Sequence, residues 1–199
     1  MALTQVQICN MALGHVGGRR LITDINEATP EANQCLLWWD TSRLTTLEMY
    51  DWSFARRDAT LAVHADAPTN GVWAFRYTLP ADYVAARYIV NPLGPLAPPA
   101  PFEVKLNIAG TAKTLLTDVE NAVLVYTMDQ TALTLWTYFA ALMQSYVLGH
   151  LIAYKLKGDL NLKAQLIQQA IRLAAQAPAQ DKNSEMQRAT ADSPSITGR

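Results

Sequence analysis

The feature that most constrains this chain is a run of 25 residues without Asp, Glu, Lys or Arg, between Asp129 and Lys155. A helix of that length could span a bilayer. The run also contains polar side chains that are costly in hydrocarbon without partners, namely Gln130, Thr131, Thr134, Thr137, Gln144, Ser145 and His150. A helix that is apolar nearly all round can instead be buried inside a protein or an assembly. We therefore expect a helix over residues 130–157 buried on several sides, which favours an oligomer. A membrane span through 130–154 is the alternative.

Composition excludes two broad classes of protein. Half of the 199 residues (50%) are hydrophobic, 17% are charged, and the formal net charge is -1. A wholly disordered chain would have low hydrophobicity and high net charge. A general nucleic-acid binder would need excess positive charge to displace counterions from phosphates. The length suits one domain, or one domain with a smaller lobe.

Residue types that carry chemistry are few and scattered. Cys9 and Cys35 form no Cys-x-x-Cys or Cys/His cluster, so they predict neither a disulfide scaffold nor a zinc site. His15, His64 and His150 have no second ligand at metal-binding spacing. We interpret His150 as a core or interface histidine with a hydrogen-bond partner. The sequence predicts no catalytic, cofactor-binding or metal-binding residue, and therefore no enzyme.

Paired carboxylates leave one enzymatic alternative open. Asp51 and Asp58 flank an aromatic segment, and Asp118 and Glu120 occupy a predicted turn. A glycosidase needs two carboxylates about 5 to 9.5 Å apart in a cleft. Because Trp and Tyr also line sugar sites, a glycan-degrading enzyme is the alternative function.

Helix signals occupy the two ends of the chain. Thr4 can cap a helix that runs to about residue 16, and Thr29-Pro30 is a strong start signal for a helix over 30–50. Apolar residues at helical spacing predict a last helix over 160–175. A polar stretch without periodicity follows it.

The middle of the chain has the period of strands. Large and small residues alternate from Trp52 through Phe54, and Trp73, Phe75 and Tyr77 alternate with smaller or polar residues. We predict these five aromatic residues to be the core of a small β module. Further strands are expected at 83–90, 102–106, 113–116 and 122–126. Five prolines within residues 91–101 exclude a helix or central strand there and predict a loop or extended arm.

These segments predict an α+β fold. It is an antiparallel bundle of about four helices with an inserted small antiparallel β module and an extended C-terminal tail. The predicted parts are a helical hairpin (1–51), the β module (52–128, with the arm at 91–101), the C-terminal helices (129–177) and the tail (178–199). Residues 155–199 carry 7 basic and 4 acidic side chains, hence +3, against 9 and 13, hence -4, for residues 1–154. This asymmetry favours an acidic partner surface for the C-terminal part.

The order of these segments resembles a known family, the tail tubular protein A or head–tail adaptor proteins of short-tailed bacteriophages. The resemblance covers about residues 4–185 and departs in the proline-rich arm. It rests on the following matches: Ile8-Cys9-Asn10-Met11-Ala12-Leu13-Gly14 with Ile22, Thr29-Pro30-Glu31-Ala32, Asp51-Trp52-Ser53-Phe54-Ala55, Trp73 to Asp82 with its Leu79-Pro80-Ala81-Asp82 end, Thr114-Leu115-Leu116-Thr117-Asp118, and Leu124-Val125-Tyr126 with Asp129.

The resemblance implies structural work without catalysis or cofactors. Family members form a ring of about twelve subunits between the portal and the tail nozzle, and genomic DNA leaves through the lumen without specific binding. It implies a virion protein at the head–tail junction, assembled in the host cytoplasm and not bound to membrane. We expect subunit contacts at Trp136, Met143 and Tyr146. We expect portal contacts in the C-terminal segment, at Gln187, Arg188, Ile196 and Arg199.

Overall fold

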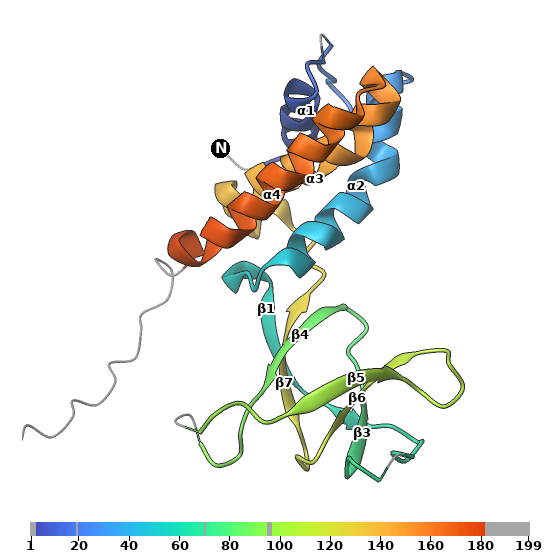
Figure 1. The fold of residues 1–199 in the computed structure, drawn as a ribbon, viewed down its shortest axis with the longest axis vertical. Helices are drawn as coiled ribbons and strands as arrows, with labels where there is room; N and C mark the ends of the chain where they lie inside the picture. Colours follow the sequence, from blue (N-terminus) through green and yellow to red (C-terminus); the bar gives the residue numbers. More distant parts are fainter. Residues whose placement is uncertain (1–2, 19, 70, 95–96, 182–199) are drawn as a thin grey trace, which may run out of the picture.

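The protein has a mixed α+β fold with two helices before the strands and two after them. The computed structural model describes residues 3–18, 20–69, 71–94 and 97–181, and within these it contains four α-helices and two antiparallel sheets. Figure 1 shows the helices together in one half of the molecule and the strands in the other half. The predicted portal-contact residues and most of the predicted tail lie outside the described residues.

Threonine side chains set the start of three helices. Thr4, Thr29 and Thr137 each accept a hydrogen bond of 3.2 Å from an amide in the first helical turn. The first two starts confirm the sequence prediction. The helices are α1 (Gln5–His15), α2 (Pro30–Met49), α3 (Tyr138–Lys157) and α4 (Leu160–Asp181).

Helix α3 contains most of the uncharged run, and the other three helices all pack against it. A Cβ atom built at Gly149 would lie 3.4 Å from the Leu166 side chain of α4 and 3.6 Å from the Ala12 carbonyl oxygen of α1, so both helices lie within van der Waals contact of α3 here. The expected burial on several sides therefore occurs within one chain. No helix of the described residues is both long enough and apolar enough to cross a membrane.

The start of α3 corrects the predicted helix over 130–157. A short 3₁₀ helix, η2 (Leu133–Leu135), precedes α3, and the Trp136 indole N–H donates to the Gln130 carbonyl (3.0 Å). This bond folds the chain back on itself, so the helix begins only after Thr137.

The end of α4 corrects the predicted tail, which was expected to begin at residue 178. Helix α4 continues through Pro178 to Asp181. Ala177 of α4 is completely buried, in the same core as Trp52 and Met143. Tertiary packing at Ala177 therefore extends the helix beyond the point where its apolar pattern fades.

The strands form two small antiparallel sheets. One has the order β1-β7-β4 and the other the order β2-β3-β6-β5. Their bounds are β1 (Arg56–Thr60), β2 (Ala62–Val63), β3 (Phe75–Thr78), β4 (Tyr83–Ile89), β5 (Phe102–Leu106), β6 (Lys113–Thr117) and β7 (Val123–Met128). The predicted strands over 83–90, 102–106, 113–116 and 122–126 are confirmed within a few residues.

The segment from Trp52 to Ala55 is not a strand, contrary to prediction. It forms a 3₁₀ helix, η1 (Ser53–Ala55), because the Trp52 indole N–H donates to the Thr46 carbonyl of α2 (2.9 Å) and draws the segment onto the helices. Strand β1 begins immediately afterwards, at Arg56.

The proline-rich segment is a loop in its described parts. The Asn91 side-chain amide donates to the Pro98 carbonyl (2.8 Å), and Ala100 forms an isolated bridge with Ile89. The loop therefore folds back against the end of β4 rather than extending as an arm.

Candidate functional site

The residues predicted to contact neighbouring subunits mostly lie in the core of this chain. Met143 has no exposed surface, and Trp136 is only 5% exposed. Tyr146 is half-buried and stacks on His15 of α1 with ring centroids 3.9 Å apart. This packing corrects the prediction for Trp136 and Met143, because side chains enclosed by their own chain have no surface left for a neighbour.

The five aromatic residues predicted as the β-module core divide between two cores. Phe75 and Tyr77 pack in the core between the sheets, together with Leu115, Leu124 and Tyr126. Trp52 and Phe54 instead pack in the helical core against α3 and α4. Trp73 is half-buried and donates its indole N–H to Glu103 (3.1 Å). Only Phe75 and Tyr77 therefore confirm the prediction.

Arginine side chains join the sheets to the helices. Arg87 of β4 donates to the Leu47 carbonyl (3.0 Å) and the Tyr50 carbonyl (2.7 Å) at the C-terminal end of α2, and to the Thr127 hydroxyl (2.7 Å) of β7. Burial lowers the pKa of Arg87, while Asp51 nearby acts to raise it. The cation thus neutralises the negative end of the helix dipole.

A second arginine reinforces this junction. Arg43 of α2 is 8% exposed and donates to Asp129, in the segment after β7, at 3.1 Å. The same guanidinium lies 3.3 Å from Asp40. Arg43 and Asp129 are 86 residues apart in the sequence, so no local pattern identifies them as partners.

The carboxylates that were considered for a glycosidase site lie in different parts of the structure. Asp51 forms ion pairs with Arg56 (3.1 Å) and Arg87 (3.7 Å) at the junction. Asp118 and Glu120 lie exposed in the turn between β6 and β7, where Asp118 accepts from the Ala74 amide (2.8 Å). Asp51 is thus occupied by structural partners, and no observation here favours glycan cleavage.

The half-buried His150 and the two buried cysteines serve packing. His150 donates from Nδ1 to the Lys163 carbonyl (2.8 Å), linking α3 to α4 as the sequence interpretation expected. The Cys9 and Cys35 thiols are free and fully buried, and the hydrogen bond with Cys35, followed by burial, raises the pKa of Cys9. Within the described residues, no three His, Cys, Asp or Glu side chains are grouped so as to hold a metal ion.

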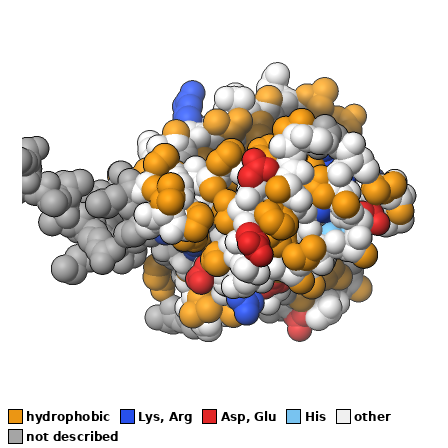
Figure 2. Space-filling model, turned by 90° about the horizontal axis from the view of Figure 1, so that it is seen from below, with side chains coloured by type: hydrophobic (Ala, Val, Ile, Leu, Met, Phe, Trp, Pro, Cys, Tyr) orange, Lys and Arg blue, Asp and Glu red, His pale blue; other side chains and the backbone are white. Residues whose placement is uncertain are grey.

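Exposed apolar side chains are the next candidate feature for a functional role. Figure 2 views the molecule from the β end and shows hydrophobic side chains spread over that face among isolated charged ones. Residues that expose large apolar side chains on the strands and loops of this half include Val63, Val72, Leu106 and Ile108. Apolar residues exposed singly are common on protein surfaces, whereas contiguous apolar patches mark sites that bind other proteins.

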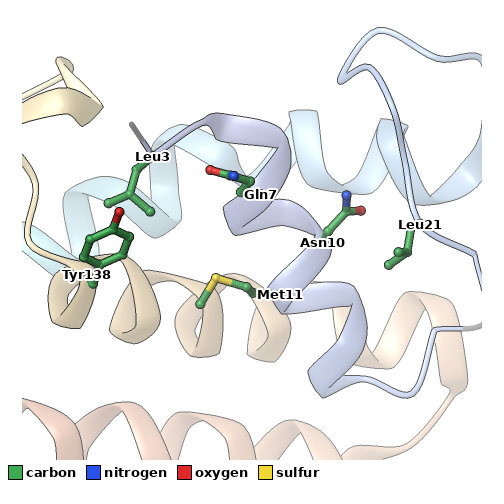
Figure 3. Close-up of a pocket in the computed structure, with 6 residues that line it drawn as sticks. All are labelled: Leu3, Gln7, Asn10, Met11, Leu21 and Tyr138. Carbon is green, nitrogen blue, oxygen red and sulfur yellow. The ribbon is translucent and has the colours of Figure 1, made fainter. Parts of the chain in front are cut away.

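Two further apolar surfaces belong to the helices. The α2 stripe consists of Leu36, Leu37 and Leu44, which are 49%, 64% and 38% exposed. The α1 groove has a volume of about 490 Å³, and Figure 3 shows its lining. Its lining residues are Leu3, Gln7, Asn10, Met11, Leu21 and Tyr138.

Sequence reasoning missed both surfaces. It followed the side of α2 on which Ala32, Cys35, Leu36, Trp39, Arg43, Leu47 and Tyr50 are spaced, and Leu36 on that side is in fact exposed. The signal for the α2 stripe was the pair Leu37 and Leu44, seven residues apart and off that side. The α1 groove combines α1, the loop after it and the start of α3, which no local pattern brings together.

No protein-family model matches the chain, and no curated protein matches it either.

Proposed function

We propose that the protein is a structural head-to-tail adaptor of a short-tailed bacteriophage. It would form a ring that joins the portal to the tail nozzle and lines part of the DNA ejection channel. The observation that carries the proposal is the order of elements: a capped helix pair, seven short strands, a buried uncharged helix and an alanine-rich helix. This is the order that the family resemblance implies.

The finer architecture is part of the proposal. The helices would form an antiparallel bundle, and a tail after α4 would bind the portal through Gln187, Arg188, Ile196 and Arg199. The basic balance of the C-terminal part supports this role, because complementary charge steers association. The exposed apolar side chains at the β end support contact with the nozzle.

The balance of charge supports the role of a conduit. With a net charge of -1, the chain has no excess of cations to hold phosphates during ejection. The apolar surfaces described above favour protein partners over nucleic acid.

The test is native mass spectrometry of the protein alone and mixed with the portal ring of the same phage. We expect a fixed multiple of the chain to add to each portal ring, whether or not the protein forms rings alone. A deletion of residues 187–199 should abolish this addition and leave the helical circular dichroism signal intact. A full-length protein that never adds to the portal would overturn the proposal.

A further inference from the structure

Three buried polar atoms on α2, on α3 and just after β7 have no hydrogen-bond partner within the described residues. They are Nε of Arg43, Oδ1 of Asp129 and Oε1 of Gln144, and a fourth such atom, Nε of Arg76, belongs to the β half. Buried polar groups in folded proteins nearly always have a partner, either a protein group or an ordered water. The first three atoms therefore mark a place where the described side chains leave hydrogen bonds unmade.

Two of these atoms belong to one ion pair. Arg43 Nη2 lies 3.1 Å from Asp129 Oδ2, and the same nitrogen lies 3.3 Å from Asp40 Oδ1. Nε and Nη2 share one edge of the guanidinium, and such an edge can bind both oxygens of one carboxylate. Here Nη2 is shared between two carboxylates, and Asp129 uses only one of its oxygens. Nε and Oδ1 therefore lie beside the same contact, one a donor and the other an acceptor, without bonding each other.

The third atom comes from α3. Gln144 is completely buried, and its Nε2 donates to the Ser42 hydroxyl at 3.4 Å. That hydroxyl donates its own proton to the Trp39 carbonyl (2.7 Å), so it has none left for an amide oxygen. The Gln144 side chain is thus oriented with Nε2 toward Ser42, which leaves Oε1 without a donor. Ser42 directly precedes Arg43, so Gln144 contacts α2 at the position next to the ion pair.

The three atoms have the donor and acceptor balance that a water molecule satisfies. A buried water typically makes about three hydrogen bonds and can both donate and accept. It can accept from the Arg43 Nε–H and donate to Asp129 Oδ1 and Gln144 Oε1. The N–H donor disfavours a cation at this place, and the two acceptor oxygens disfavour an anion.

We infer that one water molecule is bound between α2, α3 and the segment after β7, held by Arg43, Asp129 and Gln144. The two arginines at the junction then differ in kind. Arg87 uses its Nε for a protein acceptor, the Thr127 hydroxyl (2.7 Å), whereas Arg43 uses its Nε for water. The Arg43 link between the helical half and the β half is therefore mediated in part by solvent. This inference is independent of the proposed function.

A high-resolution crystal structure of the full chain tests the site directly. We expect one ordered water at a hydrogen-bond distance of about 2.7 to 3.2 Å from Arg43 Nε, Asp129 Oδ1 and Gln144 Oε1. Arg87 is the internal control, because its Nε already has Thr127 as acceptor and should bind no water. Direct bonding of Arg43 Nε to Asp129 Oδ1, a site without density, or an ion in place of water would overturn the inference.

Magnetic relaxation dispersion of the solvent counts long-lived internal waters in solution. Gln144→Met keeps the length of the side chain but removes the acceptor oxygen, and a water with fewer partners exchanges faster. We expect the count to fall by one molecule per chain. Gln168→Met is the matched control, since Gln168 is exposed on α4 and its replacement should leave the count unchanged.

Circular dichroism establishes whether both variants are folded before the counts are compared. An unchanged count for Gln144→Met, or an equal fall for Gln168→Met, would contradict the assignment of Gln144 to the site. If Gln144→Met does not fold, the crystal structure of the unmodified protein decides, because it requires no substitution.

Discussion

At the scale of single residues, the connection between the helical half and the β half of the molecule depends on Arg87. Its guanidinium satisfies carbonyl groups at the end of α2 and a hydroxyl on β7. We expect Arg87→Ala to lower the free energy of unfolding by about 2 kcal/mol, because it leaves partly buried acceptors unpaired. Urea denaturation followed by circular dichroism measures this change.

Arg57 provides the control for Arg87. Its side chain is 58% exposed, and it pairs with Asp82 at 3.0 Å. An exposed ion pair contributes little, so Arg57→Ala should cost less than about 1 kcal/mol. Equal losses in the two variants would show that Arg87 has no special role at the junction.

His15 is expected to make stability depend on pH. Burial lowers its pKa from the ordinary value of 6.5. The Ser145 hydroxyl donates to the Leu142 carbonyl (2.6 Å), so the His15 Nε2–H donates to the Ser145 oxygen (3.0 Å) and the neutral ring is already satisfied. Below pH 6.5 the unfolded chain binds the proton first, and stability therefore falls as the pH is lowered toward the folded-state value.

Unfolding measured by urea at a series of pH values tests this expectation. His15→Phe keeps a ring against Tyr146 but cannot be protonated, so its stability should fall less steeply on acidification. An unchanged slope would assign the acid sensitivity to other groups.

At the scale of elements, two glycines have opposite effects on helix ends. Gly14 lies within α1 with open space where a Cβ would stand, so Gly14→Ala should stabilise the protein by about 0.5 to 1 kcal/mol. Gly158 ends α3 with a φ of 67° and donates to the Tyr154 carbonyl. Gly158→Ala should destabilise by about 1 kcal/mol, because an L-residue is strained in that conformation. Thermal unfolding of both variants checks the two signs, and a shift in the same direction for both would refute this account.

At the scale of the whole molecule, the helical core connects the two halves. Phe54, just before β1, packs on Trp136 with ring centroids 5.2 Å apart, and Trp52 packs in the same core. We expect one cooperative transition, with the far-ultraviolet and near-ultraviolet circular dichroism signals changing together. Phe54→Ala should split this single transition into two by loosening the connection, whereas Phe75→Ala in the sheet core should keep one transition and lower its midpoint. Separate transitions in the unmodified protein would contradict the expectation.

Several elements could be predicted because their signals are local. The caps at Thr4 and Thr29 act within one helical turn, and the strands over 102–106 and 113–116 have runs of their own. The segment from Trp52 to Ala55 was assigned to the wrong structure because its deciding bond, from Trp52 to Thr46, belongs to tertiary packing. The exposed leucines of α2 and the α1 groove were missed for a similar reason, since exposure is decided by which elements cover one another.

The sequence by itself determined the α+β class, the order of helices and strands, and the need to bury an uncharged helix, because caps, periodicity and missing charge act along the chain. Only the tertiary structure decided what buries that helix. Residues from α1, α2 and α4 enclose α3 within one chain, which places Trp136 and Met143 in the core and leaves the leucines of α2 outside. The physical reason is that burial depends on distances between segments remote in sequence, and no local pattern records them.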